Sequence, residues 1–218
     1  MNVSEAVAAR KSVRAFLDTP VPDELIEELL TKAARAPSGG NVQPWRIYVI
    51  GCGTMPRFLE FMASRSGQET PAYAIYPEGL TEPYRSSRFK VGEDMYALLG
   101  IPREDKPARI RRLMENFRFF GAPAGLFCFV DRQMGPPQWS DLGMFLQTFM
   151  LLATEAGIAT CAQEAWSARP ESIAEFVGAP PEQMIFCGMA IGYADPSVPV
   201  NTLVSDREPL DVFARFVK

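Results

Sequence analysis

Histidine is absent from the 218 residues of this chain. Its absence excludes catalytic triads with a histidine base, metal sites with imidazole ligands and proton transfer by histidine. Chemistry near neutral pH then depends on a cysteine, a lysine or a carboxylate with a shifted pKa, or on a bound cofactor. Composition alone leaves these alternatives open.

Cysteine is scarce, and its spacing excludes further classes. The chain has four cysteines and no C-x-x-C pair, which argues against a zinc ribbon and against a thioredoxin-type redox motif. Cys128, Cys161 and Cys187 lie within apolar runs, so we expect buried, unreactive thiols in a reducing compartment. We predict no metal site.

Long apolar runs, a signal peptide and an excess of basic residues are also missing. No uninterrupted apolar run reaches the ~18 residues of a membrane-spanning helix, and residues 1–10 are too polar for a signal peptide. The net charge of −4 argues against a dedicated binder of nucleic acid or acidic membranes. We therefore expect a soluble cytoplasmic protein with neither nucleic acid nor membrane as partner.

Two nucleotide-binding motifs are absent as well. The sequence contains no P-loop, and Gly51-Cys52-Gly53 is followed by no third glycine at the spacing of a G-x-G-x-x-G motif. A Rossmann dinucleotide site is therefore disfavoured.

The patterns that are present predict one domain, over residues 1–218, in which strands alternate with helices. An amphipathic helix is expected at 23–35, and strands at 46–52, 125–131 and 184–193. A helix at 141–157 is apolar nearly all round, so it lies in a large core or against a second copy of the chain. Shorter helices are expected at 3–11, 56–64, 91–99, 108–117, 170–177 and 208–216.

The segment 66–106 is polar, aromatic and rich in proline and glycine, unlike its surroundings. A connection this long inside a compact domain is usually a lid or a binding loop. Tyr84 and Arg85 are its candidate substrate contacts.

Three polar clusters carry the strongest chemical signals. Residues 10–14, Arg-Lys-Ser-Val-Arg, suit a phosphate grip, because arginine offers a forked donor and serine a short one; a solvated basic helix end is the alternative. Residues 36–45 suit close approach of the backbone to a planar heteroaromatic ring; an ordinary helix-to-strand loop is the alternative. Gln163 and Glu164 suit the edge of a binding cavity, although on their own they are weak evidence for one.

Taken together, these clusters resemble the nitroreductase family of FMN-dependent NAD(P)H oxidoreductases. The resemblance rests on R-K-S-V-R at 10–14, A-P-S-G-G-N-V-Q-P-W at 36–45, N-F-R-F-F-G-A-P at 116–123 and G-I-A-T-C-A-Q-E-A-W at 157–166. It covers essentially the whole chain, and within the family residues 82–101 look most like the bacterial nitrobenzoate-reductase type.

The resemblance implies an α+β fold, a mixed β-sheet flanked by helices, in an intertwined homodimer with two FMN sites at its interface. It implies that FMN carries the hydride, with no catalytic side chain, and that NAD(P)H is the donor in a ping-pong reduction of nitroaromatic, quinone or similar substrates. The implied FMN contacts are Arg10, Lys11, Ser12, Arg14, Pro37, Ser38, Gly39, Asn41, Asn116, Gln163, Glu164 and Arg207.

Within that set, Arg10, Ser12 and Arg207 match phosphate contacts, and Arg14 matches the pyrimidine edge of the flavin. Residues 37–41 match contacts to the flavin of the other subunit, and the register at Asn116 and Arg118 is fixed only to within a few residues. The chain departs from many relatives at Gly39-Gly40, where we expect backbone contacts, and at Ala162, which is often proline.

Two other functions remain open. The same fold also hosts reductive dehalogenases and flavin-fragmenting enzymes, for which Tyr73, Tyr84 and Arg85 would clamp a zwitterionic or phenolic substrate. A flavin-binding protein without turnover is the third reading.

Overall fold

A four-stranded sheet forms the centre of the protein, which is described by a computed structural model over residues 1–217. The strands are β1 (Arg46–Ile50), β2 (Ala124–Asp131), β3 (Ala159–Gln163) and β4 (Gln183–Gly192), in the order β1-β2-β4-β3. All three pairings are antiparallel, and a parallel bridge between Ser12 and Thr160 extends the β3 edge. The four strands thus form an antiparallel sheet, and the parallel pairing expected of a mixed sheet is limited to this single bridge.

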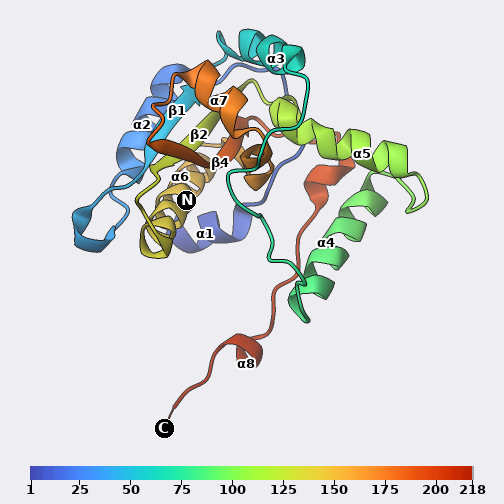
Figure 1. The fold of residues 1–218 in the computed structure, drawn as a ribbon. Coiled ribbons are helices and arrows are strands. Elements are labelled where there is room, and N and C mark those ends of the chain that lie inside the picture. The colour runs from blue at the N-terminus through green and yellow to red at the C-terminus, as the bar shows by residue number, and fades with distance from the viewer. Residues whose placement is uncertain (218) are drawn as a thin grey trace.

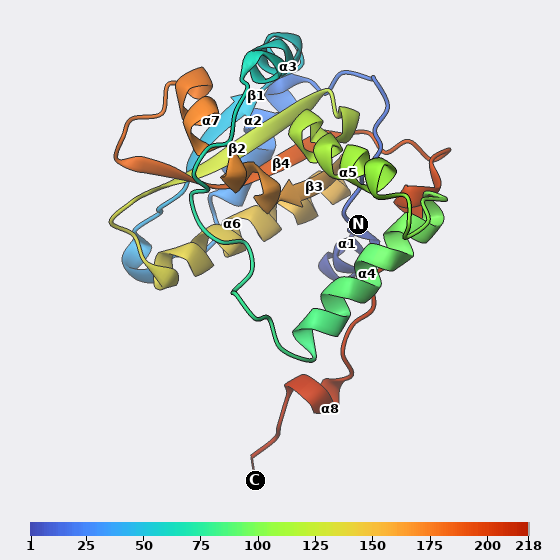
Figure 2. The same ribbon diagram turned by 45° about the vertical axis from the view of Figure 1, so that its right-hand side comes forward.

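Helices cover both faces of the sheet (Figures 1 and 2). The core on one face is closed by α2 (Asp23–Ala33) and α6 (Pro136–Glu155). The core on the other face is closed by α3 (Met55–Ser64), α7 (Pro170–Val177) and the 3-10 segments η2 (Glu115–Gly121) and η3 (Glu164–Ala168). Because both faces are covered, every residue of β2 except Asp131 is buried, which explains its continuous apolar run.

Helix α6 places one side against the sheet and leaves the other side partly bare. Leu142, Phe145 and Phe149 are buried in the core, whereas Met144 and Gln147 are exposed. Helix α1 (Val3–Ala9) contacts α6. The core position expected for α6 is confirmed, and its contact with a second copy of the chain stays a prediction.

The segment 66–106 leaves the body and returns. It first runs along the body, where Ala72 N donates to Ser167 O over 2.8 Å. It then forms α4 (Tyr84–Leu98), which with α5 (Lys106–Met114) makes an arm that projects from the sheet (Figure 2). The guanidinium of Arg109 on α5 donates to both carboxylate oxygens of Glu93 on α4, at 2.5 and 2.9 Å, which fixes the two helices together.

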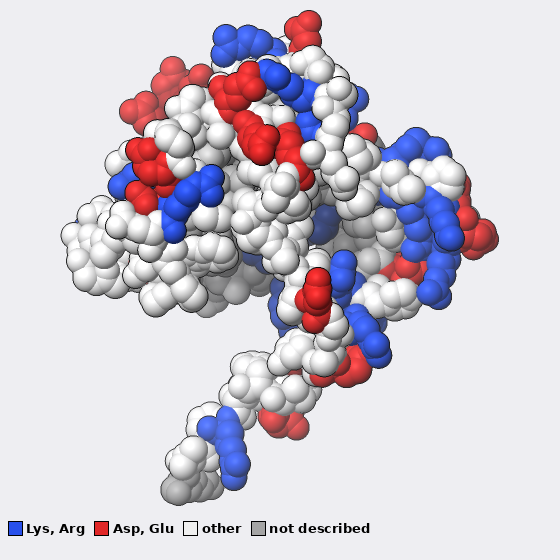
Figure 3. All heavy atoms as spheres, viewed as in Figure 1, with Lys and Arg blue, Asp and Glu red and all other residues white. Residues whose placement is uncertain are grey.

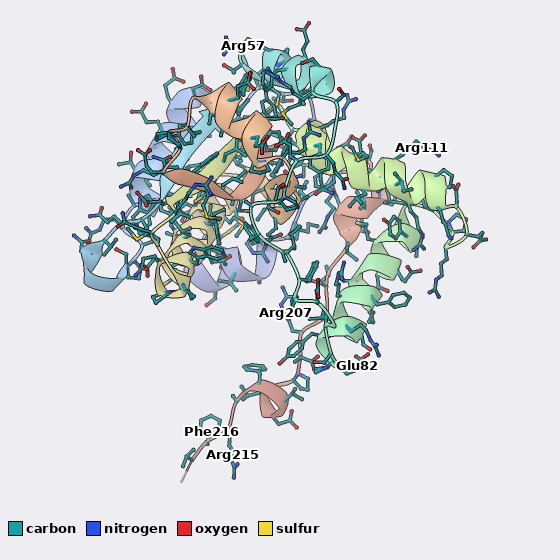
Figure 4. The ribbon with its side chains drawn as sticks, in the orientation of Figure 1. Arg57, Glu82, Arg111, Arg207, Arg215 and Phe216 are labelled. Atoms are coloured by element: carbon teal, nitrogen blue, oxygen red, sulfur yellow. The ribbon has the colours of Figure 1, made fainter. Side chains whose placement is uncertain are left out.

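The C-terminal arm, residues 203–217, extends away from the body after η4 (Pro199–Thr202) (Figure 1). Its one short helix is α8 (Leu210–Phe213). Phe213 is 69% exposed and Phe216 80% exposed, so the arm offers apolar side chains that nothing within one chain covers. Figure 4 shows Phe216 and Arg215 at the far end of this arm.

Most expected elements are present, with shifted ends. Helix α7 matches its predicted bounds, while α4 begins seven residues earlier than expected and α6 begins at Pro136 because Pro136 and Pro137 suit the first helical turn. The strand β3 was not predicted, because Ala-Thr-Cys-Ala-Gln is short and not strongly apolar. Cys128, Cys161 and Cys187 are buried, as expected. Across residues 1–217, no helix combines the length and apolarity that crossing a membrane requires.

Candidate functional site

The basic segment 10–14 is fixed along the edge of β3. Val13 N donates to Thr160 O over 3.0 Å, and the side-chain oxygen of Asn201 accepts from Arg14 N over 2.9 Å. Val13 is buried in the core and Lys11 is exposed. Since side chains alternate along extended backbone, Arg10, Ser12 and Arg14 project together from the opposite side.

These side chains line a cavity of about 570 Å³, which we call cavity A. Its volume lies within the usual range for small-molecule sites, ~300–1,000 Å³. None of the residues that line it is acidic, and four of them are cationic. The lining consists of Val7, Ala8, Arg10, Lys11, Ser12, Arg14, Val91, Gln147, Leu203, Val204, Ser205 and Arg207. An anionic group is the complementary ligand.

The C-terminal arm and α4 bring Arg207 to cavity A. Arg207 Nη1 donates to its neighbours, at 3.0 Å to Ser205 O and 2.7 Å to Asp206 O. Asp206 also pairs with Lys90 of α4 over 2.8 Å, which raises the pKa of Lys90 and lowers that of Asp206. Figure 4 shows Arg207 between the body and α4. Two segments distant in sequence therefore meet at this cavity.

A second cavity, cavity B, adjoins the first. It measures about 290 Å³ and shares Arg14, Val91 and Leu203 with cavity A. Its remaining lining comes from the segment before α4, from α4, α5 and η2, and consists of Tyr76, Arg88, Gly92, Met95, Tyr96, Arg112, Leu113, Asn116 and Phe120. Both linings include residues of α4, and we call the two adjoining cavities together the recess. Figure 3 shows cationic side chains within the hollow between the body and the arm formed by α4 and α5.

Gln163 lies at the end of β3 and is buried rather than open to cavity A or B. Its side-chain nitrogen donates to Asn116 O over 2.9 Å, and the indole nitrogen of Trp166 lies 3.4 Å from its side-chain oxygen. A Cβ atom at Gly188 would lie 2.2 Å from Trp166, so glycine is required for the indole to pack there. The Gln163 side chain thus positions η2, whereas Glu164 beside it is exposed.

The loop at Pro37–Asn41 lies away from both cavities of its own chain, and none of its residues lines either. Gly39 N donates to both carboxylate oxygens of the buried Asp141 on α6, at 3.2 and 3.3 Å. Gly40 and Asn41 have positive φ values of 58° and 56°, which favour glycine and tolerate asparagine. The loop therefore has a defined shape and an exposed Asn41.

Tyr84 and Arg85 lie at the exposed N-terminal end of α4, and neither lines cavity A or B. Arg85 pairs with Glu82 over 2.7 Å, and Figure 4 shows Glu82 at that outer end of α4. Tyr73 instead packs into the body, where its hydroxyl donates to Phe186 O and desolvation raises its pKa. The roles predicted for Tyr84 and Arg85 stay predictions.

Sequence reasoning missed three residues that lie at or behind the site. Asp141 looked like an ordinary polar residue at a helix start, and Arg88 and Arg112 were indistinguishable from the other arginines of α4 and α5. A buried carboxylate or an unpaired guanidinium leaves no local sequence signal. Within the described residues, no cluster of three or more cysteines and carboxylates is arranged to hold a metal ion.

Comparison with known proteins identifies similar chains. The sequence model of the nitroreductase family matches residues 7–193. The chain is 38% identical over 213 residues to a 4-nitrobenzoate reductase of Pseudomonas putida, covering 97% of this chain and 93% of the relative. It is 36% identical to a nitrobenzene nitroreductase of Ectopseudomonas oleovorans, covering 99% and 96%.

A solved structure agrees with the fold. The FMN and NADPH-dependent nitroreductase NfnB from Sphigopyxis sp. strain HMH superposes with a TM-score of 0.93 and 44% sequence identity, over 100% of both chains.

Proposed function

The chain belongs to the nitroreductase family, and from that premise we propose that it is an FMN-dependent oxidoreductase that takes hydride from NAD(P)H and reduces nitroaromatic compounds. The observation that carries the proposal is cavity A, whose lining has four cations and no acidic residue. The relatives that match the whole chain are nitroreductases, and the FMN and NADPH-dependent nitroreductase NfnB shares the architecture of this chain.

The residues of cavity A fit the phosphate end of FMN. A phosphate prefers arginine forks and short hydroxyl or backbone donors, and Arg10, Ser12 and Arg207 offer these groups. No carboxylate in the lining opposes the anion. We assign the phosphate to Arg10, Ser12 and Arg207, with Lys11 as a weaker, exposed contributor.

Arg14 lies at the junction of cavities A and B, where the flavin ring would leave the phosphate end. Its guanidinium places positive charge at the pyrimidine edge, where negative charge develops on reduction. Asn116 lines cavity B and is held by Gln163, so it offers an oriented amide to the same edge. When bound, FMN supplies the hydride chemistry that links NAD(P)H to the oxidant.

A homodimer completes this site in our proposal. Cavities A and B lack the Pro37–Asn41 loop of their own chain, so the partner's loop is the one available to cover the flavin. The exposed C-terminal arm, together with Met144 on α6, offers apolar surface to a second copy. Asp141 would hold the loop in shape for its partner.

The cysteines support a cytoplasmic location. All four are unbridged, which suits a reducing cytoplasm. We therefore propose a cytoplasmic homodimer that acts on small molecules.

The test is anaerobic stopped-flow on the purified holoenzyme. Mixing with NADPH or NADH should bleach the visible flavin absorbance, and a nitroaromatic added afterwards should restore it, as a ping-pong cycle requires. A protein that binds FMN but is not bleached by either nucleotide would be a flavin-binding protein without turnover, and the proposal would be wrong.

A further inference from the structure

Cavity B contains arginines that no carboxylate of the described chain neutralises. None of its lining residues is acidic, and neither Arg88 nor Arg112 forms an ion pair within residues 1–217. Arg112 is partly buried, and withdrawing a cationic group from water without an anion beside it is unfavourable. The arrangement indicates a ligand that brings the negative charge.

The arginines of α5 show why Arg112 is distinct. Arg109 is held by Glu93 of α4 and stacks on Tyr96, so its charge is neutralised. Arg111 is exposed and points away from the recess (Figure 4). Arg112 points into cavity B instead, and it alone of the three is neither paired nor open to solvent on all sides.

The surroundings of Arg112 leave part of its guanidinium without a partner. Its Nη2 donates to Arg14 O over 2.9 Å, and the guanidinium carbon lies 5.0 Å from the centroid of Phe120. Its Nε is buried and has no hydrogen-bond acceptor. Desolvation lowers the pKa of Arg112, Arg14 lowers it further, and Glu115 opposes that shift in part.

Arg88 approaches the same cavity from α4. Its guanidinium carbon lies 3.9 Å from the ring centroid of Tyr76, which orients the side chain by a cation–π contact. A cationic side chain fixed by an aromatic ring, with its donors unused, suits a planar oxyanion. Tyr76 and Phe120 add apolar walls beside the two arginines.

We propose that Arg88 and Arg112 form an oxyanion subsite in cavity B that binds the carboxylate of an aromatic acid substrate. This inference rests on the proposed function and names the substrate class of the same recess. Arg14, shared with cavity A, lies between this subsite and the phosphate residues, so a carboxylate held by Arg88 and Arg112 directs the rest of the ring toward the flavin.

The kinetic test compares a charged substrate with a neutral one of the same shape. For the FMN-loaded wild type, 4-nitrobenzoate and 4-nitrobenzamide are reduced with NADPH, and Arg112→Gln, Arg112→Lys and Arg88→Gln are measured beside it. Loss of a charge-assisted hydrogen bond should raise KM for 4-nitrobenzoate about ten- to hundredfold, with KM for 4-nitrobenzamide changed less than about threefold. Arg112→Lys should recover part of the loss, and Arg111→Gln should change neither substrate.

A binding test that needs no turnover accompanies it. Benzoate and benzamide are titrated into the oxidised holoenzyme, and the shift of the visible flavin band reports their dissociation constants. Benzoate should bind the wild type more tightly than benzamide, and Arg88→Gln should remove that preference while the amount of bound FMN stays unchanged. Arg88→Gln keeps the test decisive if Arg112→Gln fails to fold, because Arg88 is exposed on α4.

Three outcomes would overturn the subsite. Equal losses on both nitro compounds, release of FMN by both arginine variants, or a KM increase confined to NADPH would assign these arginines to the flavin or to the nicotinamide nucleotide. Failure of the wild type to reduce even 4-nitrobenzamide would instead contradict the proposed function, so the two failures are distinguishable.

Discussion

The side-chain nitrogen of Gln163 lies 2.9 Å from the backbone oxygen of Asn116 and 3.3 Å from its side-chain oxygen. This contact joins the end of β3 to η2 across 47 positions of sequence. It orients a residue that lines cavity B through one that is itself buried. The recess therefore depends on a buried amide that does not line it.

Replacing Gln163 by glutamate should destabilise the fold. The substitution removes the donor and places a carboxylate oxygen against the oxygens of Asn116, and an unsatisfied buried polar group costs about 1–3 kcal/mol. Urea unfolding of Gln163→Glu should show this loss in the free energy of unfolding, and Glu164→Gln next to it, on an exposed side chain, should stay within about 0.5 kcal/mol of the wild type. Equal stability of Gln163→Glu would mean that the contact contributes nothing.

The phosphate assignment predicts unequal effects within one cluster. Arg10→Ala and Arg207→Ala should each weaken FMN binding about ten- to hundredfold, since a hydrogen bond to a charged group contributes about 1.5–3 kcal/mol. Lys11→Ala should weaken it much less, because Lys11 lines cavity A with a side chain that is exposed to solvent. Quenching of flavin fluorescence measures the dissociation constants. An equal loss of FMN affinity in all three variants would mean that the cluster is only a diffuse basic patch.

Asp141 should control the loop at Pro37–Asn41. Asp141→Ala removes the acceptor of Gly39 N, so we expect about 1–3 kcal/mol lower stability and weaker FMN binding, whereas Asp141→Asn keeps one acceptor oxygen and should lose less. Denaturant unfolding and FMN titration measure the two effects. Ser140→Ala, one residue earlier on α6 and bonded only to Pro137 O, is the matched control. If Asp141→Ala left the FMN affinity unchanged, the loop at Pro37–Asn41 would not be part of the flavin site.

The C-terminal arm should stabilise the homodimer. Phe213→Ser combined with Phe216→Ser removes apolar side chains that are largely exposed in their own chain. The monomer should therefore keep its fold, while the dimer should dissociate at a higher protein concentration than the wild type. Size-exclusion chromatography with light scattering, with and without FMN, measures this change. Arg215→Ser, on the same arm, should not alter the dimer. An undiminished dimer in the double variant would remove the arm from the interface.

The pairing of α4 with α5 should weaken in acid. The hydrogen bonds from Arg109 lower the pKa of Glu93 from its ordinary value of 4.5. A carboxylate with a lowered pKa in the folded state contributes stability that is present above the unfolded pKa and is lost as pH falls through the folded one. The difference in thermal midpoint between wild type and Glu93→Gln should therefore shrink as pH falls below about 4.5. A difference that is constant with pH would contradict the ion pair.

The sequence by itself determined the family and the helix-covered sheet, and it predicted the residues of the phosphate cluster. These features are local or periodic: Arg10 to Arg14 are contiguous, α2 has a helical apolar stripe, and β2 is a continuous apolar run. The motif at 36–45 likewise needs only neighbouring residues to be recognised. The same locality explains why β3 was missed, since its five residues become a strand only by pairing with β4.

Only the tertiary structure decided which charges are neutralised and which are left over. Arg109, Arg111 and Arg112 lie within four positions of one helix, yet one is paired with Glu93, one faces solvent and one lines cavity B. Their fates depend on where α4 and η2 pack, through contacts between residues far apart in sequence. The burial of Asp141 beneath Gly39, across 102 positions, was beyond sequence reasoning for the same physical reason.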